Sequence, residues 1–165
     1  MDKFIDKISS YNLLNNLLPG AVYIFLINIL FGVNILENNL IENLFVYYFI
    51  GMVISRVGSV VIEPLCIRMR IVVYADYGDY LKASLKDNKI DILTETNNTY
   101  RTILSLCVML MVSKIYLVLS KKILWFSSNS SFVIIVALLI LFLLSYRKQT
   151  SYIKKRVLKV NEREK

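Results

Sequence analysis

The hydrophobic positions of this chain gather in four blocks, separated by polar and charged stretches. The blocks cover about residues 17–36, 44–66, 102–120 and 131–146, and the first contains no charged residue. A helix of about 20 residues, at 1.5 Å per residue, matches the roughly 30 Å hydrocarbon core of a bilayer. The pattern therefore predicts an all-α integral membrane four-helix bundle, forming a single membrane domain over residues 1–165.

The block at 131–146 is the shortest, but its flanks are typical of a membrane span. Trp125 and Phe126 precede it and Arg147 and Lys148 close it, as expected for an aromatic belt and a basic boundary. A soluble helical bundle is the alternative, and soluble core helices keep a polar face at helical spacing. Residues 132–144 offer no such face, so the membrane interpretation is favoured.

Residues 1–18 carry apolar residues three or four positions apart, at Phe4, Ile8, Tyr11, Leu14 and Leu18. This spacing predicts an N-terminal interfacial helix lying along the membrane surface. We expect Pro19 and Gly20 to end it with a bend, because proline is tolerated in the first turn of the following helix. A frayed N-terminus is the alternative.

Within the predicted cytoplasmic segment 67–101, the polar region 74–101 is too short to form a core of its own. Residues 76–87 predict a short helix, and the apolar positions from Ile90 onward predict a second helix that continues into the third span. Asp76 and Asp79 could suggest a cation site, but the spacing of the glycine and of later carboxylates does not fit a calcium loop. We therefore expect no metal site there.

The cytoplasmic tail 147–165 is basic and has apolar residues at near-helical spacing, which predicts a basic C-terminal helix extending the fourth span. Its basic residues include Arg147, Lys148, Lys154, Lys155, Arg156 and Lys159. Anionic lipid is the expected partner, at about 1 kcal/mol for each basic side chain near the surface. A cytosolic protein partner is also compatible with the tail, and nucleic acid is less favoured.

The distribution of Lys and Arg predicts the orientation of the chain. Sixteen of these residues fall before the first block, between the second and third, or after the fourth, whereas only Lys121 and Lys122 fall on the opposite side. Basic residues collect on the cytoplasmic side of bacterial inner membrane proteins. Both termini are therefore expected in the cytoplasm.

Composition excludes several kinds of chemistry. The chain has no His and only two Cys, Cys66 and Cys107, which are expected to be reduced packing thiols. A zinc cluster, a His general base and a disulfide framework are therefore excluded. We expect no cofactor and no enzymatic activity.

Four polar residues inside the apolar blocks are candidates for function, because charge at membrane depth is costly. They are Asn28, Arg56, Glu63 and Lys114. Arg56 and Glu63 are seven residues apart and would share one face of a straight α-helix, so they could pair, or Arg56 could meet a neighbouring chain. Asn28 is a further candidate neighbour of Arg56, whereas Lys114 is near enough to the outer surface to snorkel.

The second block also carries a small-residue stripe, formed by Gly51, Ser55, Gly58 and Ser59. Such stripes allow close helix approach in membranes. The stripe is rotated from the Arg56 face, so the helix offers two surfaces. Either could pack within the chain while the other serves a homo-oligomer, and packing wholly within one chain is the alternative.

The stretch from Tyr48 to Leu65, together with Tyr100-Arg101 and Tyr146-Arg147-Lys148, resembles small four-pass proteins of the bacterial inner membrane. The resemblance implies that location and no catalytic residues. The leading functional hypothesis is an oligomeric pore or membrane effector, of the kind bacteria use in phage defence. The alternatives are a membrane anchor or sensor subunit that recruits a cytosolic partner and, with less support, a small-solute transporter.

Overall fold

The computed structural model describes residues 2–123, 125 and 128–161, and for residues 2–14 only the backbone is described. All regular structure in these residues is helical. The long helices are α1 (Asp2–Phe31), α2 (Leu40–Val57), α5 (Lys89–Lys122) and α7 (Ser130–Asn161). A π-helical segment (Gly58–Ile62) joins α2 to α3 (Glu63–Arg68), and α4 (Tyr77–Ser84) is a short helix before α5.

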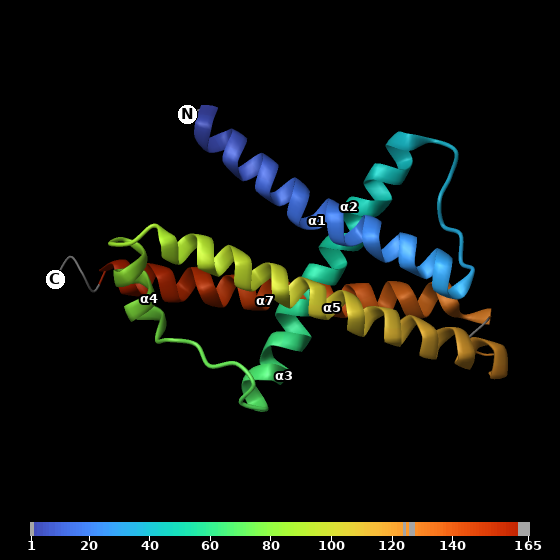
Figure 1. Cartoon of the computed structure of the whole chain (residues 1–165). Helices are drawn as coiled ribbons and strands as arrows, with labels where there is room; N and C mark the ends of the chain where they lie inside the picture. The colour runs from blue at the N-terminus through green and yellow to red at the C-terminus, as the bar shows by residue number, and fades with distance from the viewer. Residues whose placement is uncertain (1, 124, 126–127, 162–165) are drawn as a thin grey trace.

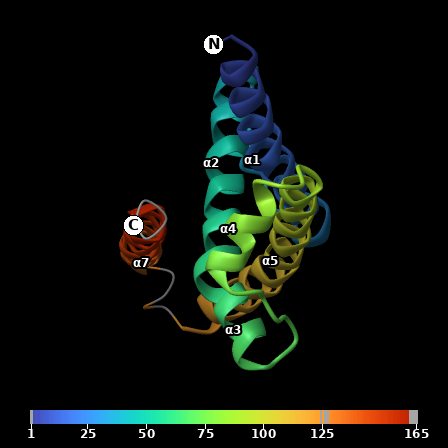
Figure 2. The same cartoon turned by 90° about the vertical axis from the view of Figure 1, so that its left-hand side faces the viewer.

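The other long helices pack around the continuous rod formed by α2, the π-helical segment and α3. This rod runs obliquely across α5 and α7 in Figure 1, and α1 crosses its first half. The perpendicular view in Figure 2 places α7 on one side of the rod and α1 and α5 on the other. The start of α1, the start of α5 and the end of α7 all lie toward the same side of the molecule in Figure 1.

Within the described part of the chain, three helices are long and apolar enough to cross a membrane: Leu40–Arg68, Lys89–Lys122 and Ser130–Asn161. They contain the second, third and fourth predicted blocks and are consistent with a membrane-embedded protein. The first predicted block corresponds to a shorter apolar helix, Asn15–Phe31. It ends before residue 36 because Gly32 adopts a left-handed conformation, with φ of 69°, which is typical of a helix C-terminus. A fourth span stays a prediction.

The expected end of the first helix at Pro19 and Gly20 is wrong, because α1 is one helix that continues through both residues. Proline removes one backbone hydrogen bond from a helix interior. At this point, however, α1 is pressed against α2, and that contact favours a continuous helix. The amphipathic face predicted for residues 1–18 lies almost wholly on side chains outside the described part.

Two glycines bring the backbones of α1 and α2 together. A Cβ atom on Gly20 would lie 1.7 Å from the carbonyl oxygen of Tyr47, and one on Gly51 would lie 1.6 Å from that of Asn16. Both distances are far inside van der Waals contact. Only glycine therefore permits this crossing, which is the small-residue packing expected between helices in lipid.

The apolar core begins one turn after this crossing along both α1 and α2. It consists of Tyr23, Ile24 and Ile27 from α1, Ile54 from α2 and Leu106 from α5. Two polar contacts tie the same helices together: the hydroxyls of Tyr23 and Ser113 are 2.5 Å apart, and Ser105 Oγ donates to the Ile54 carbonyl at 2.7 Å. These hydroxyls are thereby satisfied inside the apolar region.

The other predicted helices are confirmed in outline. The short helix predicted within residues 67–101 is α4, whose first turn is capped by Asp76: its carboxylate accepts a hydrogen bond from the Gly78 amide at 2.7 Å. The second helix of this segment continues into the third block as α5. The tail forms the last part of α7 as far as Asn161. Residues 162–165 of the predicted tail lie outside the described residues.

Candidate functional site

The site begins with a backbone irregularity between α2 and α3. In the π-helical segment the amide of Glu63 donates to the carbonyl of Gly58, five residues earlier. The next residue, Pro64, has no N–H to donate. The carbonyl of Ser59 therefore loses both of its usual helical donors and is open to a side chain from another helix.

Lys148 of α7 fills this position. Its ammonium group donates to the Ser59 carbonyl at 2.5 Å and to Glu63 Oε1 at 3.1 Å. The same ammonium lies 5.6 Å from the ring centroid of Tyr152, one turn further along α7. A lysine flanking an apolar block thus satisfies the carbonyl that Pro64 leaves open.

Glu63 is also bound by Arg101 of α5, whose Nη1 lies 2.5 Å from Glu63 Oε2. We call Glu63, Arg101 and Lys148 the charged junction. The Glu63 side chain is only 11% exposed, and the two cations are 21% and 23% exposed. One carboxylate thus joins three helices and leaves the junction with one net positive charge.

The charges of the junction also act on the pKa of Tyr152, which lies beyond the apolar block of α7. Burial raises the pKa of the Tyr152 phenol above its ordinary value, and the negative charge of Glu63 adds to this effect. Arg101 acts in the opposite direction. Tyr152 therefore stays protonated and neutral at physiological pH beside the charged groups.

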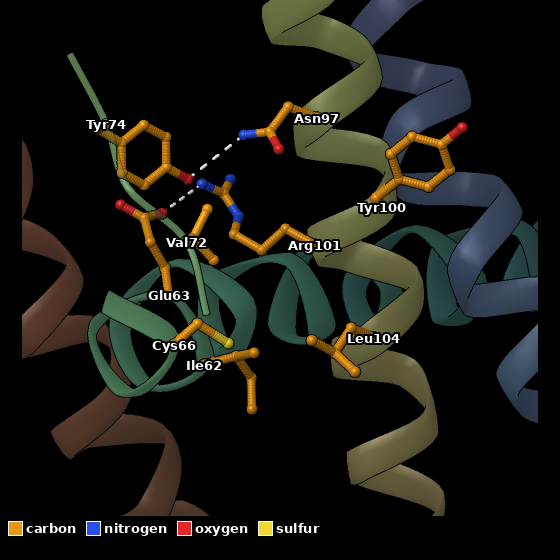
Figure 3. Close-up of a pocket in the computed structure, with 9 residues that line it drawn as sticks. All are labelled: Ile62, Glu63, Cys66, Val72, Tyr74, Asn97, Tyr100, Arg101 and Leu104. Atoms are coloured by element: carbon orange, nitrogen blue, oxygen red, sulfur yellow. Dashed lines mark hydrogen bonds and ion pairs between the residues drawn. The ribbon is translucent and has the colours of Figure 1, made fainter. Parts of the chain in front are cut away.

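The turn that ends α3 builds the wall of a cavity next to the junction. The amide of Arg70 donates to the Ile67 carbonyl and that of Ile71 to the Cys66 carbonyl, while Arg70 adopts a left-handed φ of 58°. This pair of bonds is a Schellman motif, here with arginine at the position usually taken by glycine. It reverses the chain, so that Val72 and Tyr74 pass back over α3 (Figure 3).

The cavity has a volume of about 150 Å³, is partly open, and lies between the π-helical segment with α3, the segment after α3, and α5. Its lining residues are Ile62, Glu63, Cys66, Val72, Tyr74, Asn97, Tyr100, Arg101 and Leu104 (Figure 3). Asn97 Nδ2 donates to the Tyr74 hydroxyl at 3.3 Å. Arg101 Nε is buried and has no hydrogen-bond partner among the described atoms. The cavity thus combines a largely apolar wall with an arginine that keeps one buried, unpaired guanidinium donor.

Of the two arrangements that the sequence leaves open for Arg56, the pairing with Glu63 is not found in the structure. A π-helical turn holds one residue more than an α-helical turn, which rotates everything after it by about 100° relative to a straight α-helix. Glu63 consequently faces α5 and α7, whereas Arg56 is exposed. Arg56 forms no hydrogen bond or ion pair with the residues that the structure describes.

The other two intramembrane candidates also lie apart from the charged junction. Asn28 is exposed, and in the described ranges its side chain makes no hydrogen bond to Arg56 or to any other residue. Lys114 is exposed and places its ammonium 5.1 Å from the ring centroid of Phe31. This cation–π contact shields part of the lysine at the end of α1.

The small-residue stripe is used within the chain. Gly51 contacts α1, and Gly58 lies against Ser105 and Arg101 of α5. Ser55 is buried, and Ser59 provides the carbonyl for Lys148. Of the two helix surfaces offered by the sequence, the stripe is therefore internal and the Arg56 face is external.

The basic residues of the tail also divide into some that contact other helices and some that are exposed. Lys148 belongs to the charged junction, and the aliphatic part of Lys159 lies close to Gly78 of α4. The remaining basic residues named above are exposed: Arg147, Lys154, Lys155 and Arg156. Cys66 is a buried thiol in the cavity wall, and Cys107 is an exposed one.

Sequence reasoning missed three residues of this site: Arg101, Asn97 and Tyr74. The sequence places Arg101 only at the basic flank before the third block. One local signal was present, because a proline inside an apolar helix opens a carbonyl to outside donors. That signal indicates a need for a polar partner but does not indicate which helix supplies it.

Comparison with known proteins assigns no family or function to this site. No model of a protein family, no curated protein and no solved structure matches the chain.

Proposed function

We propose that this chain is a multi-pass protein of the bacterial inner membrane, with both termini in the cytoplasm, whose copies assemble into an oligomeric pore or membrane effector. The observation that carries the proposal is the position of Arg56. It lies on the outer surface of the central rod, near the end of α2, with no partner among the described residues.

An arginine in such a place needs water or a partner. A charged side chain at the bilayer centre costs about 2.5–3.5 kcal/mol on insertion scales. The other charges inside the apolar blocks are supported within the chain: Glu63 is paired, and Lys114 contacts an aromatic ring. A water-filled path between copies of the chain would hydrate the Arg56 guanidinium and remove its cost.

The packing of the small-residue stripe within the chain also favours the Arg56 face as the surface where copies meet. Gly51 and Gly58 are already buried against α1 and α5, so they are not open to a second copy. Neighbouring copies would instead meet around the Arg56 face. Since a few helices cannot enclose a wide channel alone, the path would form at the centre of a ring of copies.

The first test combines oligomeric state with ion flux. The full chain would be placed in nanodiscs for mass measurement and in potassium-loaded liposomes for efflux. We expect a closed ring and potassium efflux for the unaltered protein. Arg56→Ala should lower the rate of efflux about tenfold, which corresponds to about 1.4 kcal/mol of free energy.

Arg147→Ala is the matched control, because Arg147 is also an exposed arginine but lies after the apolar block. It should leave efflux unchanged. A monomer that retains potassium in its liposomes would refute the pore, and equal losses from the two variants would refute the role of Arg56.

One observation favours the second candidate, a membrane anchor that recruits a cytosolic protein. The aliphatic chain of Lys159 lies 3.3 Å from where a Cβ on Gly78 would be, so α4 and the basic end of α7 are in contact. Replacing Lys154, Lys155 and Arg156 together by Gln should abolish co-purification of such a partner and leave the oligomer intact. Recovery of the chain without a stoichiometric partner in either form would exclude it.

A further inference from the structure

We propose that the cavity beside Arg101 binds the phosphate group of an anionic phospholipid at the cytoplasmic boundary of the membrane. This site is separate from the Arg56 face. It goes beyond the proposed pore, because it would exist whether or not the protein conducts ions.

The free edge of Arg101 is the first support. Its Nη1 is committed to Glu63, but Nε is buried without a hydrogen-bond partner in the described structure. A buried donor that lacks an acceptor costs about 1–3 kcal/mol. The guanidinium fork is suited to two oxygens of one phosphate, so a phosphate in the cavity would satisfy this donor.

The local charge also suits an anion. Glu63 lines the cavity and would repel a phosphate if it stood alone. Its two oxygens are, however, bound by Arg101 and Lys148, which leaves the junction with one net positive charge. The Tyr74 hydroxyl accepts from Asn97 and retains its own proton for donation into the cavity.

The walls favour a lipid over a free phosphate ion. Ile62, Val72 and Leu104 give the cavity an aliphatic lining, which suits the glycerol and ester portion of a lipid. Tyr100 and Leu104 are exposed at its edge, at the start of the third apolar block. Basic pockets between helices on the cytoplasmic side of a membrane are recognised sites for anionic headgroups.

Thermal unfolding of the full chain in a neutral detergent provides the first test. Added dioleoylphosphatidylglycerol should raise Tm by about 4 °C through preferential binding to the folded state, whereas dioleoylphosphatidylcholine should not. Inorganic phosphate forms a separate arm. An equal rise with inorganic phosphate would overturn the lipid assignment, and no rise with either would overturn the site.

Substitutions of Arg101 and Lys148, the two partners of Glu63, distinguish loss of lipid binding from a general loss of stability. Arg101→Gln should remove the lipid-dependent rise, and Arg101→Lys should remove most of it, because lysine keeps the charge but lacks the fork. Lys148→Met is the matched control: it also deprives Glu63 of one cation, but Lys148 does not line the cavity. It should lower the starting Tm and keep more of the rise than Arg101→Gln does, because each variant removes one positive charge but only Arg101→Gln also removes the donor in the cavity.

A tail variant with Lys154, Lys155 and Arg156 replaced by Gln should retain the rise as well. Persistence of the rise in Arg101→Gln, or its loss in the tail variant alone, would place the lipid elsewhere and overturn the proposal.

Cys66 gives a second readout that needs no substitution at Arg101. Its thiol lines the cavity, and the exposed thiol can be removed as Cys107→Ser. In nanodiscs, alkylation of Cys66 by N-ethylmaleimide should be about tenfold slower with phosphatidylglycerol than with phosphatidylcholine alone. An equal rate in the two bilayers would show an empty cavity and refute the site.

Discussion

The crossing of α1 with α2 and the attachment of α7 are two different ways of joining helices in this protein. At the crossing, Gly20 and Gly51 bring two backbones into contact above an apolar core. By contrast, none of the most apolar window of α7 is buried, and its contacts lie against α2 and the π-helical segment. Lys148 anchors α7 there through the Ser59 carbonyl and Glu63.

The comparison shows what each kind of contact supplies in a low-dielectric surrounding. Lipid is as apolar as leucine, so burial of apolar side chains gives little preference for another helix over lipid. Close packing and polar contacts must supply that preference. The glycine crossing uses the first and the charged junction uses the second, so the two should respond differently to substitution.

The largest effect is expected at the glycine crossing. Gly51→Ala places a methyl group 1.6 Å from the Asn16 carbonyl, so the helices must separate. We expect a loss of about 3 kcal/mol of stability, at the upper end of overpacking costs, measured as unfolding in detergent. Gly58→Ala is the graded control, because its nearest contact would be 3.3 Å away. Equal losses at the two glycines would contradict the tight crossing.

A smaller effect is expected at the charged junction. Glu63→Gln leaves Arg101 and Lys148 facing each other without a counter-charge and should cost about 2 kcal/mol, below the 3–5 kcal/mol of a fully buried pair. The discount reflects the partial exposure of both cations.

The junction also predicts a specific coupling. In a double-mutant cycle of Glu63→Gln with Lys148→Met, the two losses should be less than additive, because both remove the same ion pair. Strict additivity would show that α7 is held by something else.

The smallest effect is expected at Ser105. Its hydroxyl is fully buried and donates to the Ile54 carbonyl at 2.7 Å. Hydrogen bonds between membrane helices average about 0.6 kcal/mol in mutant cycles, so Ser105→Ala should cost about that much. A loss as large as that of Gly51→Ala would mean that polar contacts, rather than close packing, dominate around the core.

Local pattern was enough for the helices themselves. The short helical pattern of residues 76–87 predicted α4, and the helical spacing from Ile90 onward predicted α5. The fourth apolar block and the spacing of apolar residues in the tail predicted α7. At Pro19, by contrast, the local pattern gave the wrong prediction. A proline favours a helix start locally, but contact between Gly20 and a distant helix outweighed that preference.

The amino-acid sequence by itself determined an apolar helical chain with a one-sided distribution of basic residues, because hydropathy and charge are properties of each residue. Only the tertiary structure decided the partners of Glu63, which are 38 and 85 residues away along the chain. A single π-helical turn rotates Glu63 away from Arg56, and the helix crossing brings Arg101 and Lys148 to it. Pairing depends on distances between helices, which the spacing of residues within one helix does not contain.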